Sequence, residues 1–251
     1  MNKKIKTEIP IEKKMVATKN NTGKKQQVKL MFNNIAHRYD FLNHFLSAGI
    51  DYSWRRKAIN ILGKNHPKTI LDVATGTGDL AIAALKIKPE KVIGIDIAAD
   101  MVEVGLQKIK KKKLQDIIHL ETGDSENLKF PHESFDAVMV AFGVRNFEDL
   151  QKGLSEMHRV LKPSGQVLIL EFSQPSKFPV KQFYNFYFRF ILPFLGKIIS
   201  GDKSAYTYLH DSVEVFPYGD NFLEILKETG FKNTFHKSLT FGIASIYSGI
   251  K

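Results

Sequence analysis

The sequence predicts an α/β fold in which a mostly parallel sheet carries helices on both faces. Two observations indicate it. From Thr69 onward, short runs rich in β-branched residues alternate with helical patterns, an order typical of parallel strands joined by helices. A turn with two spaced glycines follows the first run, as in sheets that bind a ligand at the first strand-to-helix turn. At 251 residues the chain is long enough for one such domain with a full hydrophobic core.

The expected strands and helices follow one another in a regular order. Helical patterns begin after Asp79, after Ala98 and at Asp149, and Lys162-Pro163-Ser164-Gly165 ends the last of them. Strands are expected at TILDVA (69–74), KVIGID (91–96), IIHLET (117–122), FDAVMVAF (135–142) and QVLILEF (166–172). Two final strands, FKNTFHKSL (231–239) and GIASIYSGI (242–250), close a seven-stranded sheet. Ligands bind beyond the carboxyl ends of such strands, so the residues there are the functional candidates.

Most of the positive charge lies in the first part of the chain. The formal net charge is +11, and residues 1–29 hold nine Lys against two Glu. This stretch is polar and aperiodic, so we expect a disordered tail before a single domain over residues 30–251. The run KIKKKK (108–113) is expected to be a solvated helix end. The domain lacks an interleaved basic and aromatic surface, so we expect no nucleic-acid partner.

The chain contains no Cys, which excludes a disulfide framework, thiolate catalysis and cysteine-based zinc sites. This composition fits a protein of the reducing cytoplasm. We expect no metal in the site.

The stretch LDVATGTGDLA (71–81) carries the glycine turn. Gly76 and Gly78 flank Thr77, and the two glycines let the backbone turn tightly and approach a ligand closely. Dehydrogenases that bind a dinucleotide and methyltransferases that bind S-adenosylmethionine both use this pattern. A dehydrogenase of the short-chain type also needs a Tyr-x-x-x-Lys pair on a helix, and the one literal match ends at Lys251, on a predicted strand.

Three acids near strand ends favour the methyltransferase interpretation. Asp96 can accept hydrogen bonds from both ribose hydroxyls of either cofactor. Asp72 lies beside the glycine turn, where it would repel a pyrophosphate and attract the ammonium and sulfonium of S-adenosylmethionine. Asp124 can accept from an adenine amino group, with Ser125 supplying a backbone donor. Each acid alone is equally consistent with a capping or turn role, but together they indicate a cofactor site.

Three longer segments resemble a known family, the ubiquinone/menaquinone biosynthesis C-methyltransferases. These are YDFLNHFLSAGIDYSW (39–54), FGVRNFED (142–149) and RVLKPSGQVLILEFS (159–173). The resemblance runs over nearly all of residues 30–251. The chain departs from the family pattern at Leu42, Asp51, Ser164 and Ala141, where Met, His, Gly and, in several relatives, Ser are usual.

The resemblance implies a Rossmann-like class I S-adenosylmethionine-dependent methyltransferase. It implies transfer of the methyl group to a ring carbon of a polyprenylated quinol, first of all demethylmenaquinol to menaquinol. The benzoquinol intermediate of ubiquinone biosynthesis is an alternative, and an NAD(P)-binding oxidoreductase is an alternative from another class. Carried over by position, the cofactor contacts fall on Thr77, Asp96, Asp124 and Ser125. Asp51 replaces a proton carrier, so we do not expect that position to be essential.

The chemistry of carbon methylation points to the loop after the fourth strand. A quinol carbon becomes nucleophilic when a neighbouring hydroxyl loses its proton, and phenols ionise near pH ~10. Arg145 is the expected cation that lowers this pKa, with Asn146 orienting a water or the quinol oxygen. The alternative for Arg145 is a salt bridge to Glu148 or Asp149.

Two other segments are candidates for the substrate side. Tyr39, Asp40 and Asn43 precede the first strand, where a helix could close over the site, and His37 or His44 is either a proton carrier or a surface residue. The aromatic and basic segment 177–200 is too interrupted to span a membrane.

Phe183, Phe186 or Tyr187, Phe190 and Phe194 share one helical face of this segment. That face either packs on the core or a second copy of the chain, or forms a pocket wall that touches the membrane surface transiently, which we prefer. We therefore expect a cytoplasmic protein at the inner face of the cell membrane, and leave a homodimer open.

Overall fold

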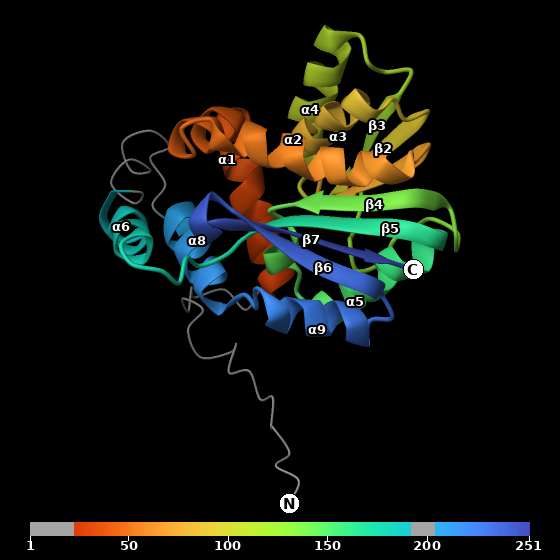
Figure 1. The fold of residues 1–251 in the computed structure, drawn as a ribbon. Helices are drawn as coiled ribbons and strands as arrows, with labels where there is room; N and C mark the ends of the chain where they lie inside the picture. Colours follow the sequence, from red (N-terminus) through yellow and green to blue (C-terminus); the bar gives the residue numbers. More distant parts are fainter. Residues whose placement is uncertain (1–22, 192–203) are drawn as a thin grey trace, which may run out of the picture.

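A computed structural model describes residues 23–191 and 204–251 (Figure 1). At its centre is a seven-stranded sheet in the order β3-β2-β1-β4-β5-β7-β6. Strand β7 is antiparallel to both neighbours, and the pairs among β1 to β5 are parallel. The strands are β1 (Thr69–Val73), β2 (Lys91–Asp96), β3 (Ile118–Thr122), β4 (Phe135–Ala141), β5 (Leu161–Phe172), β6 (Lys232–Leu239) and β7 (Ala244–Ile250). The predicted fold class is confirmed.

Helices cover both faces of the sheet because successive side chains of a strand point to opposite faces. The helices are α1 (Lys24–Leu46), α2 (Ile50–Leu62), α3 (Asp79–Ala84), α4 (Ala99–Lys112), α5 (Leu150–Val160), α6 (Val180–Phe186), α8 (Ser204–Val215) and α9 (Asp220–Glu228). On β1, Ile70 packs in one core layer with α2, α3 and α4, whereas Leu71 packs in the other with α5 and α9.

The carboxyl end of the parallel strands is covered by helices from distant parts of the sequence. Figure 1 shows α1, α6 and α8 on the side to which the β4 arrow points. The short 3-10 turn η4 (Val144–Asn146) follows β4 at this end, and the π-helical turn η5 (Tyr187–Ile191) continues α6. Within residues 23–191 and 204–251, no helix is long and apolar enough to cross a membrane.

Three details differ from the sequence-based expectation. Helix α1 begins at Lys24, so residues 24–29 are helical, not part of a disordered tail; residues 1–22 lie outside the described residues. Strand β5 begins at Leu161, ahead of the stretch 162–165 that was expected only to end a helix. Lys108 is not solvated, because its ammonium lies 2.7 Å from Asp79 Oδ1.

Candidate active site

Two adjoining cavities lie where the strand order reverses, between β1 and β4. The chain runs outward from β1 through β2 to β3 and then returns to β4 on the other side of β1. A crevice at this switch point is the usual ligand site of such sheets. We call the two cavities the Asp96 cavity, with a volume of about 70 Å³, and the Arg145 cavity, with about 400 Å³. Phe32, Tyr39 and Phe142 line both cavities.

The glycine turn and Asp96 form one wall of the Asp96 cavity. The Asp96 carboxylate accepts hydrogen bonds from the backbone N–H groups of Gly76, at 2.8 Å, and Ala98, at 2.9 Å. Gly76 has a φ of 57°, and a Cβ built there would lie 3.3 Å from the terminal methyl of Met101. Burial raises the pKa of Asp96 above its ordinary value. The glycine at position 76 therefore permits both the left-handed turn and the close approach to α4.

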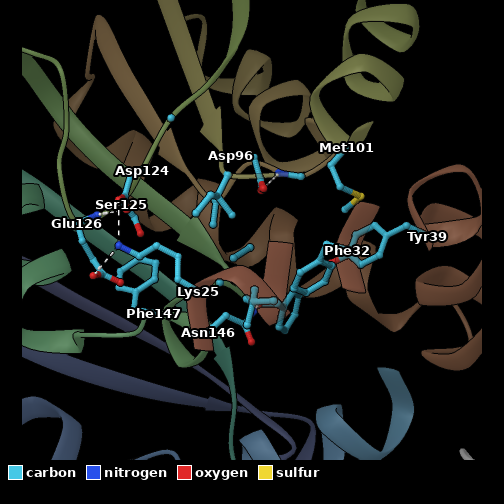
Figure 2. A pocket seen from close by; sticks show the side chains of 18 residues that line it. Lys25, Phe32, Tyr39, Asp96, Met101, Asp124, Ser125, Glu126, Asn146 and Phe147 are labelled. Atoms are coloured by element: carbon cyan, nitrogen blue, oxygen red, sulfur yellow. Dashed lines mark hydrogen bonds and ion pairs between the residues drawn. The ribbon is translucent and has the colours of Figure 1, made fainter. Parts of the chain in front are cut away.

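Asp124 and Ser125, which follow the neighbouring strand β3, form a second part of the wall, together with a residue that the sequence did not single out. Figure 2 shows the Lys25 side chain of α1 reaching into the cavity toward Asp124 and Glu126. The Lys25 ammonium lies 2.9 Å from Asp124 Oδ2 and 3.0 Å from Glu126 Oε2. Burial would raise the pKa of Asp124, but the Glu126 N–H and the Lys25 ammonium outweigh it and lower that pKa.

Asp72, Thr77 and Gly78 do not line the cavity surface. Asp72 is 1% exposed, accepts the Thr75 hydroxyl at 2.6 Å, and its Oδ1 has no hydrogen-bond partner among the described residues. Burial raises the pKa of Asp72 to about 7. The Thr77 hydroxyl donates to Asp40 of α1, so this side chain ties the turn to the covering helix.

These residues fit S-adenosylmethionine. A buried carboxylate with an unsatisfied oxygen is suited to a neighbouring positive charge, which the cofactor carries as ammonium and sulfonium. The Asp96 and Asp124 carboxylates both line the cavity, where they can serve as acceptors for ribose hydroxyls and an adenine amino group. Ligand sites have volumes of roughly 300–1,000 Å³. The Asp96 cavity is far smaller, and the Lys25 side chain lies in its wall against Asp124.

The Arg145 cavity is mainly apolar, and buried polar groups converge on it. Arg145, which follows β4 in η4, pairs through Nη1 with Glu171 Oε1 of β5 at 2.8 Å. Glu171 also accepts the backbone N–H of Arg145 at 3.3 Å and is 0% exposed. Burial raises the pKa of Glu171, partly offset by Arg145. The ion pair is therefore with Glu171, and neither Glu148 nor Asp149, the two partners considered from the sequence, pairs with Arg145.

The charge of Arg145 affects the pKa of three nearby tyrosine hydroxyls. Burial raises the pKa of Tyr39, of Tyr184 and of Tyr208, the last to about 12, and the charge of Arg145 opposes the rise at each. All three line the Arg145 cavity. Asn146 lines the Asp96 cavity, and its Oδ1 accepts the Tyr208 hydroxyl at 3.0 Å. The loop after β4 thus contributes to both cavities.

The aromatic segment lies beside the Arg145 cavity, and the described residues of the aromatic face identified from the sequence are not packed on the core. Tyr184 is buried, whereas Phe183, Phe186 and Phe190 are exposed. Phe183 still lines the mouth of the cavity. Phe194, the fourth residue expected on this face, lies outside the described residues.

Of the two candidate proton carriers, the structure places only His44 in a polar cluster near the cavities. His44 Nδ1 lies 2.7 Å from Asp51 Oδ2, and Asp51 lines the Arg145 cavity. His37 is exposed on α1.

Replacing Lys25 with Met is expected to tighten S-adenosylmethionine binding. The change removes an ion pair with Asp124 that the cofactor would otherwise have to displace. Losing this partly exposed ion pair is expected to lower the cofactor Kd by about 2- to 5-fold. Isothermal titration at low and high salt measures it, and the gain should shrink as salt rises. Lys29→Met on the same helix is the control. Weaker binding by Lys25→Met would show that the lysine holds the cofactor instead.

The raised pKa of Asp72 predicts a pH-dependent affinity. Below about pH 7 the carboxyl of the free protein is protonated, and a cationic cofactor must displace that proton, so Kd is expected to rise as pH falls from ~8 to ~5.5. Titration in buffers of different ionisation enthalpy should detect proton release near pH 7. Asp72→Asn should abolish both effects. The Asp72→Asn variant should also have a higher Tm than the wild type, by a larger margin at pH 8 than at pH 5. The reason is that the buried wild-type carboxylate destabilises the fold as pH rises toward the pKa of Asp72 in the folded protein.

Comparison with known proteins agrees with this geometry. The model of the ubiE/COQ5 methyltransferase family matches residues 20–251. A demethylmenaquinone methyltransferase of Bacteroides fragilis is 50% identical over 233 residues, covering 92% of this chain and 95% of that protein. A ubiquinone/menaquinone biosynthesis C-methyltransferase of Geotalea daltonii is 47% identical over 232 residues, covering 92% and 98%.

Solved structures show the same fold at low sequence identity. A SAM-dependent methyltransferase from Thermotoga maritima superposes with a TM-score of 0.61 at 16% identity, covering 88% of this chain and 99% of that one. A phosphoethanolamine N-methyltransferase of Haemonchus contortus in complex with S-adenosyl-L-methionine gives 0.58 at 17%, covering 88% and 60%. By the extent and identity of its sequence matches, the chain belongs to the ubiE/COQ5 methyltransferase family.

Proposed function

We propose that this S-adenosylmethionine-dependent enzyme methylates a ring carbon of a polyprenylated quinol, converting demethylmenaquinol to menaquinol. The observation that carries the proposal is the Arg145 cavity, which is apolar, adjoins the cofactor site and places a guanidinium among phenol groups. Relatives from Bacteroides fragilis and Porphyromonas gingivalis, 50% and 43% identical, are demethylmenaquinone methyltransferases. Family membership leaves no support for the NAD(P)-dependent alternative, and the benzoquinol is a weaker second candidate.

Each residue has a distinct task in this proposal. Bound S-adenosylmethionine supplies an electrophilic methyl group. Asp96 holds the ribose, Asp124 and Ser125 hold the adenine edge, and Asp72 balances the positive charge. Gly76, Thr77 and Gly78 shape the turn.

Arg145 stabilises the quinol oxygen as it loses its proton, and Asn146 orients that oxygen or a water. Transfer of the methyl group to the ring carbon beside this oxygen would break the carbon–sulfur bond of the bound donor. The ring carbon would then lose its own hydrogen and the oxygen would regain a proton, so one proton would be released overall. Enclosure and positioning supply the remaining acceleration.

The exposed aromatic side chains support contact with a membrane surface, where a polyprenyl tail is held. Phe178 and Phe183 are 81% and 71% exposed, and Lys177 and Lys181 beside them are also exposed. Phe183 lines the mouth of the Arg145 cavity, so a ring carried on a membrane-held tail could reach the cavity there.

An assay of the purified protein tests the proposed reaction. Incubation with S-adenosylmethionine and a short-chain demethylmenaquinol is expected to yield the ring-methylated product by mass spectrometry, with the label of a deuterated methyl donor on carbon. A faster reaction with a benzoquinol would reassign the ring. Methyl transfer to neither ring, in protein that binds the cofactor, would contradict the proposal.

Neutralising Arg145 tests its role in ionisation. Because Arg145→Met alone leaves Glu171 buried and unpaired, the double variant Arg145→Met/Glu171→Gln is the better probe. We expect kcat to fall by about 10²-fold with cofactor Kd nearly unchanged. The deficit should shrink as pH rises toward ~10, where a phenol ionises without help. Arg56→Met, on the exposed side of α2, is the control. A deficit that stays constant with pH would assign Arg145 a structural role.

Vesicle co-sedimentation tests the membrane contact. Phe178→Ser/Phe183→Ser is expected to lower binding to vesicles that contain anionic lipid, because it removes apolar area and leaves the charge unchanged. Phe235→Ser, on β6 and 42% exposed, is the control. Analytical ultracentrifugation tests the alternative. If the wild-type protein is a dimer, the double variant is a monomer and vesicle binding is unchanged, this face belongs to a contact with a second copy of the chain.

A further inference from the structure

The Arg145 cavity has a second polar wall, formed where α1 turns into α2. Asp51, Ser47 and Arg55 line the cavity there. Asp51 is only 3% exposed and Arg55 only 7%, so both charges are held away from water. Asp51 stands where members of the family usually have His, and the mechanism above gives it no task. A carboxylate in the wall of an apolar cavity needs an explanation.

Three neighbours fix the Asp51 carboxylate and leave part of it available. The Ser47 hydroxyl donates to Oδ1 at 2.7 Å, whereas His44 Nδ1, at 2.7 Å, and Arg55 Nη1 contact Oδ2. Burial would raise the pKa of Asp51, but Ser47, Arg55 and His44 outweigh it and lower that pKa. A carboxylate accepts about four hydrogen bonds, two on each oxygen. Oδ1 can therefore accept one further donor.

The reaction treats the two hydroxyls of a quinol differently. The hydroxyl beside the methylated carbon must lose its proton, which the Arg145 cation favours. The other hydroxyl stays protonated and remains a hydrogen-bond donor. A carboxylate accepts a hydrogen bond from that O–H and repels an oxyanion. It therefore disfavours ionisation of the hydroxyl that has to stay protonated. The oxidised quinone has two carbonyl oxygens and no donor to offer.

We propose that Asp51 Oδ1 accepts the hydrogen of the quinol hydroxyl that stays protonated, and so makes the cavity selective for the reduced ring. This inference rests on the proposed function and adds a specificity residue to it. The physical basis is that a buried polar group built to pair with a substrate hydroxyl is left unpaired by an analogue that lacks it, and such sites discriminate strongly. The guanidinium of Arg55, paired with Asp51 Oδ2 and 3.7 Å from Asp79, keeps the carboxylate in place.

The test compares three short-chain rings on the wild-type enzyme: the quinol, the naphthol that lacks only the second hydroxyl, and the quinone. We expect kcat/KM for the naphthol to be at least about 100-fold lower than for the quinol, and the quinone to inhibit only weakly. Equal turnover of the naphthol, or a quinone that competes as well as the quinol binds, would overturn the inference. Absence of methyl transfer to every ring would overturn the proposed function with it.

Two substitutions at position 51 test whether Asp51 is the residue that makes the cavity selective for the quinol. In Asp51→Asn, Arg55 and His44 orient the amide oxygen toward themselves, so the NH₂ group takes the place of Oδ1 and offers a donor to the cavity. The ratio of quinone Ki to quinol KM is then expected to fall about 10-fold, with cofactor Kd unchanged. Asp51→His introduces the residue that members of the family usually have at this position. This variant should fold and keep the preference for the quinol, because a neutral imidazole can accept a hydrogen bond from the quinol hydroxyl. Asp116→Asn, at an exposed carboxylate, is the control. An unchanged ratio in a folded Asp51→Asn variant would overturn the assignment.

Discussion

The ion pair between Arg145 and Glu171 holds the reacting end of the molecule together. It joins the turn after β4 to the end of β5, and Glu171 is fully buried. Breaking such a pair from one side costs about 3–5 kcal/mol, because a charge stays behind without a partner. The pair also fixes the position of a positive charge in an apolar cavity, and strands β4 and β5 fix its position relative to the Asp96 cavity. The electrostatics of the substrate side therefore depend on a contact within the sheet.

Helix α1 adds a second constraint, because it crosses both cavities. Near its start, Lys25 pairs with Asp124 and Glu126, and further along, Asp40 accepts from Thr77 and pairs with Lys108. Phe32 and Tyr39, between these contacts, line both cavities. The two cavities thus share a wall that belongs to neither the sheet nor its connecting helices. Any shift of α1 that widens one cavity also changes the wall of the other.

The sequence predicted the sheet and the loops after its strands, because strand periodicity and glycine turns are local signals. Asp96, Asp124 and Ser125 line one cavity, and the sequence pointed to them because each lies at or just after the end of a recognisable strand. Lys25 could not be found, since it lay in a Lys-rich stretch and its role depends on how α1 crosses the sheet. Glu171 had a usable signal, a lone acid in the apolar strand QVLILEF, but its partner depends on the pairing of β4 with β5. Asp72 was expected at the surface of the cofactor site, but it is buried and does not line the cavity.

The accessible lining residues of the two cavities belong to different parts of the molecule, and under the proposed function this separation has a kinetic consequence. The half-buried Lys25 at the start of α1 lines the Asp96 cavity, whereas the exposed Ile50 and Phe183 line the Arg145 cavity. If the cofactor and the ring occupy these two cavities as proposed, the spent cofactor and the methylated ring leave from sites with different accessible walls. In the proposed membrane-bound arrangement, the methyl donor would then be exchanged at the Lys25 side while Phe183 stays against the lipid, so successive turnovers would not require the enzyme to dissociate.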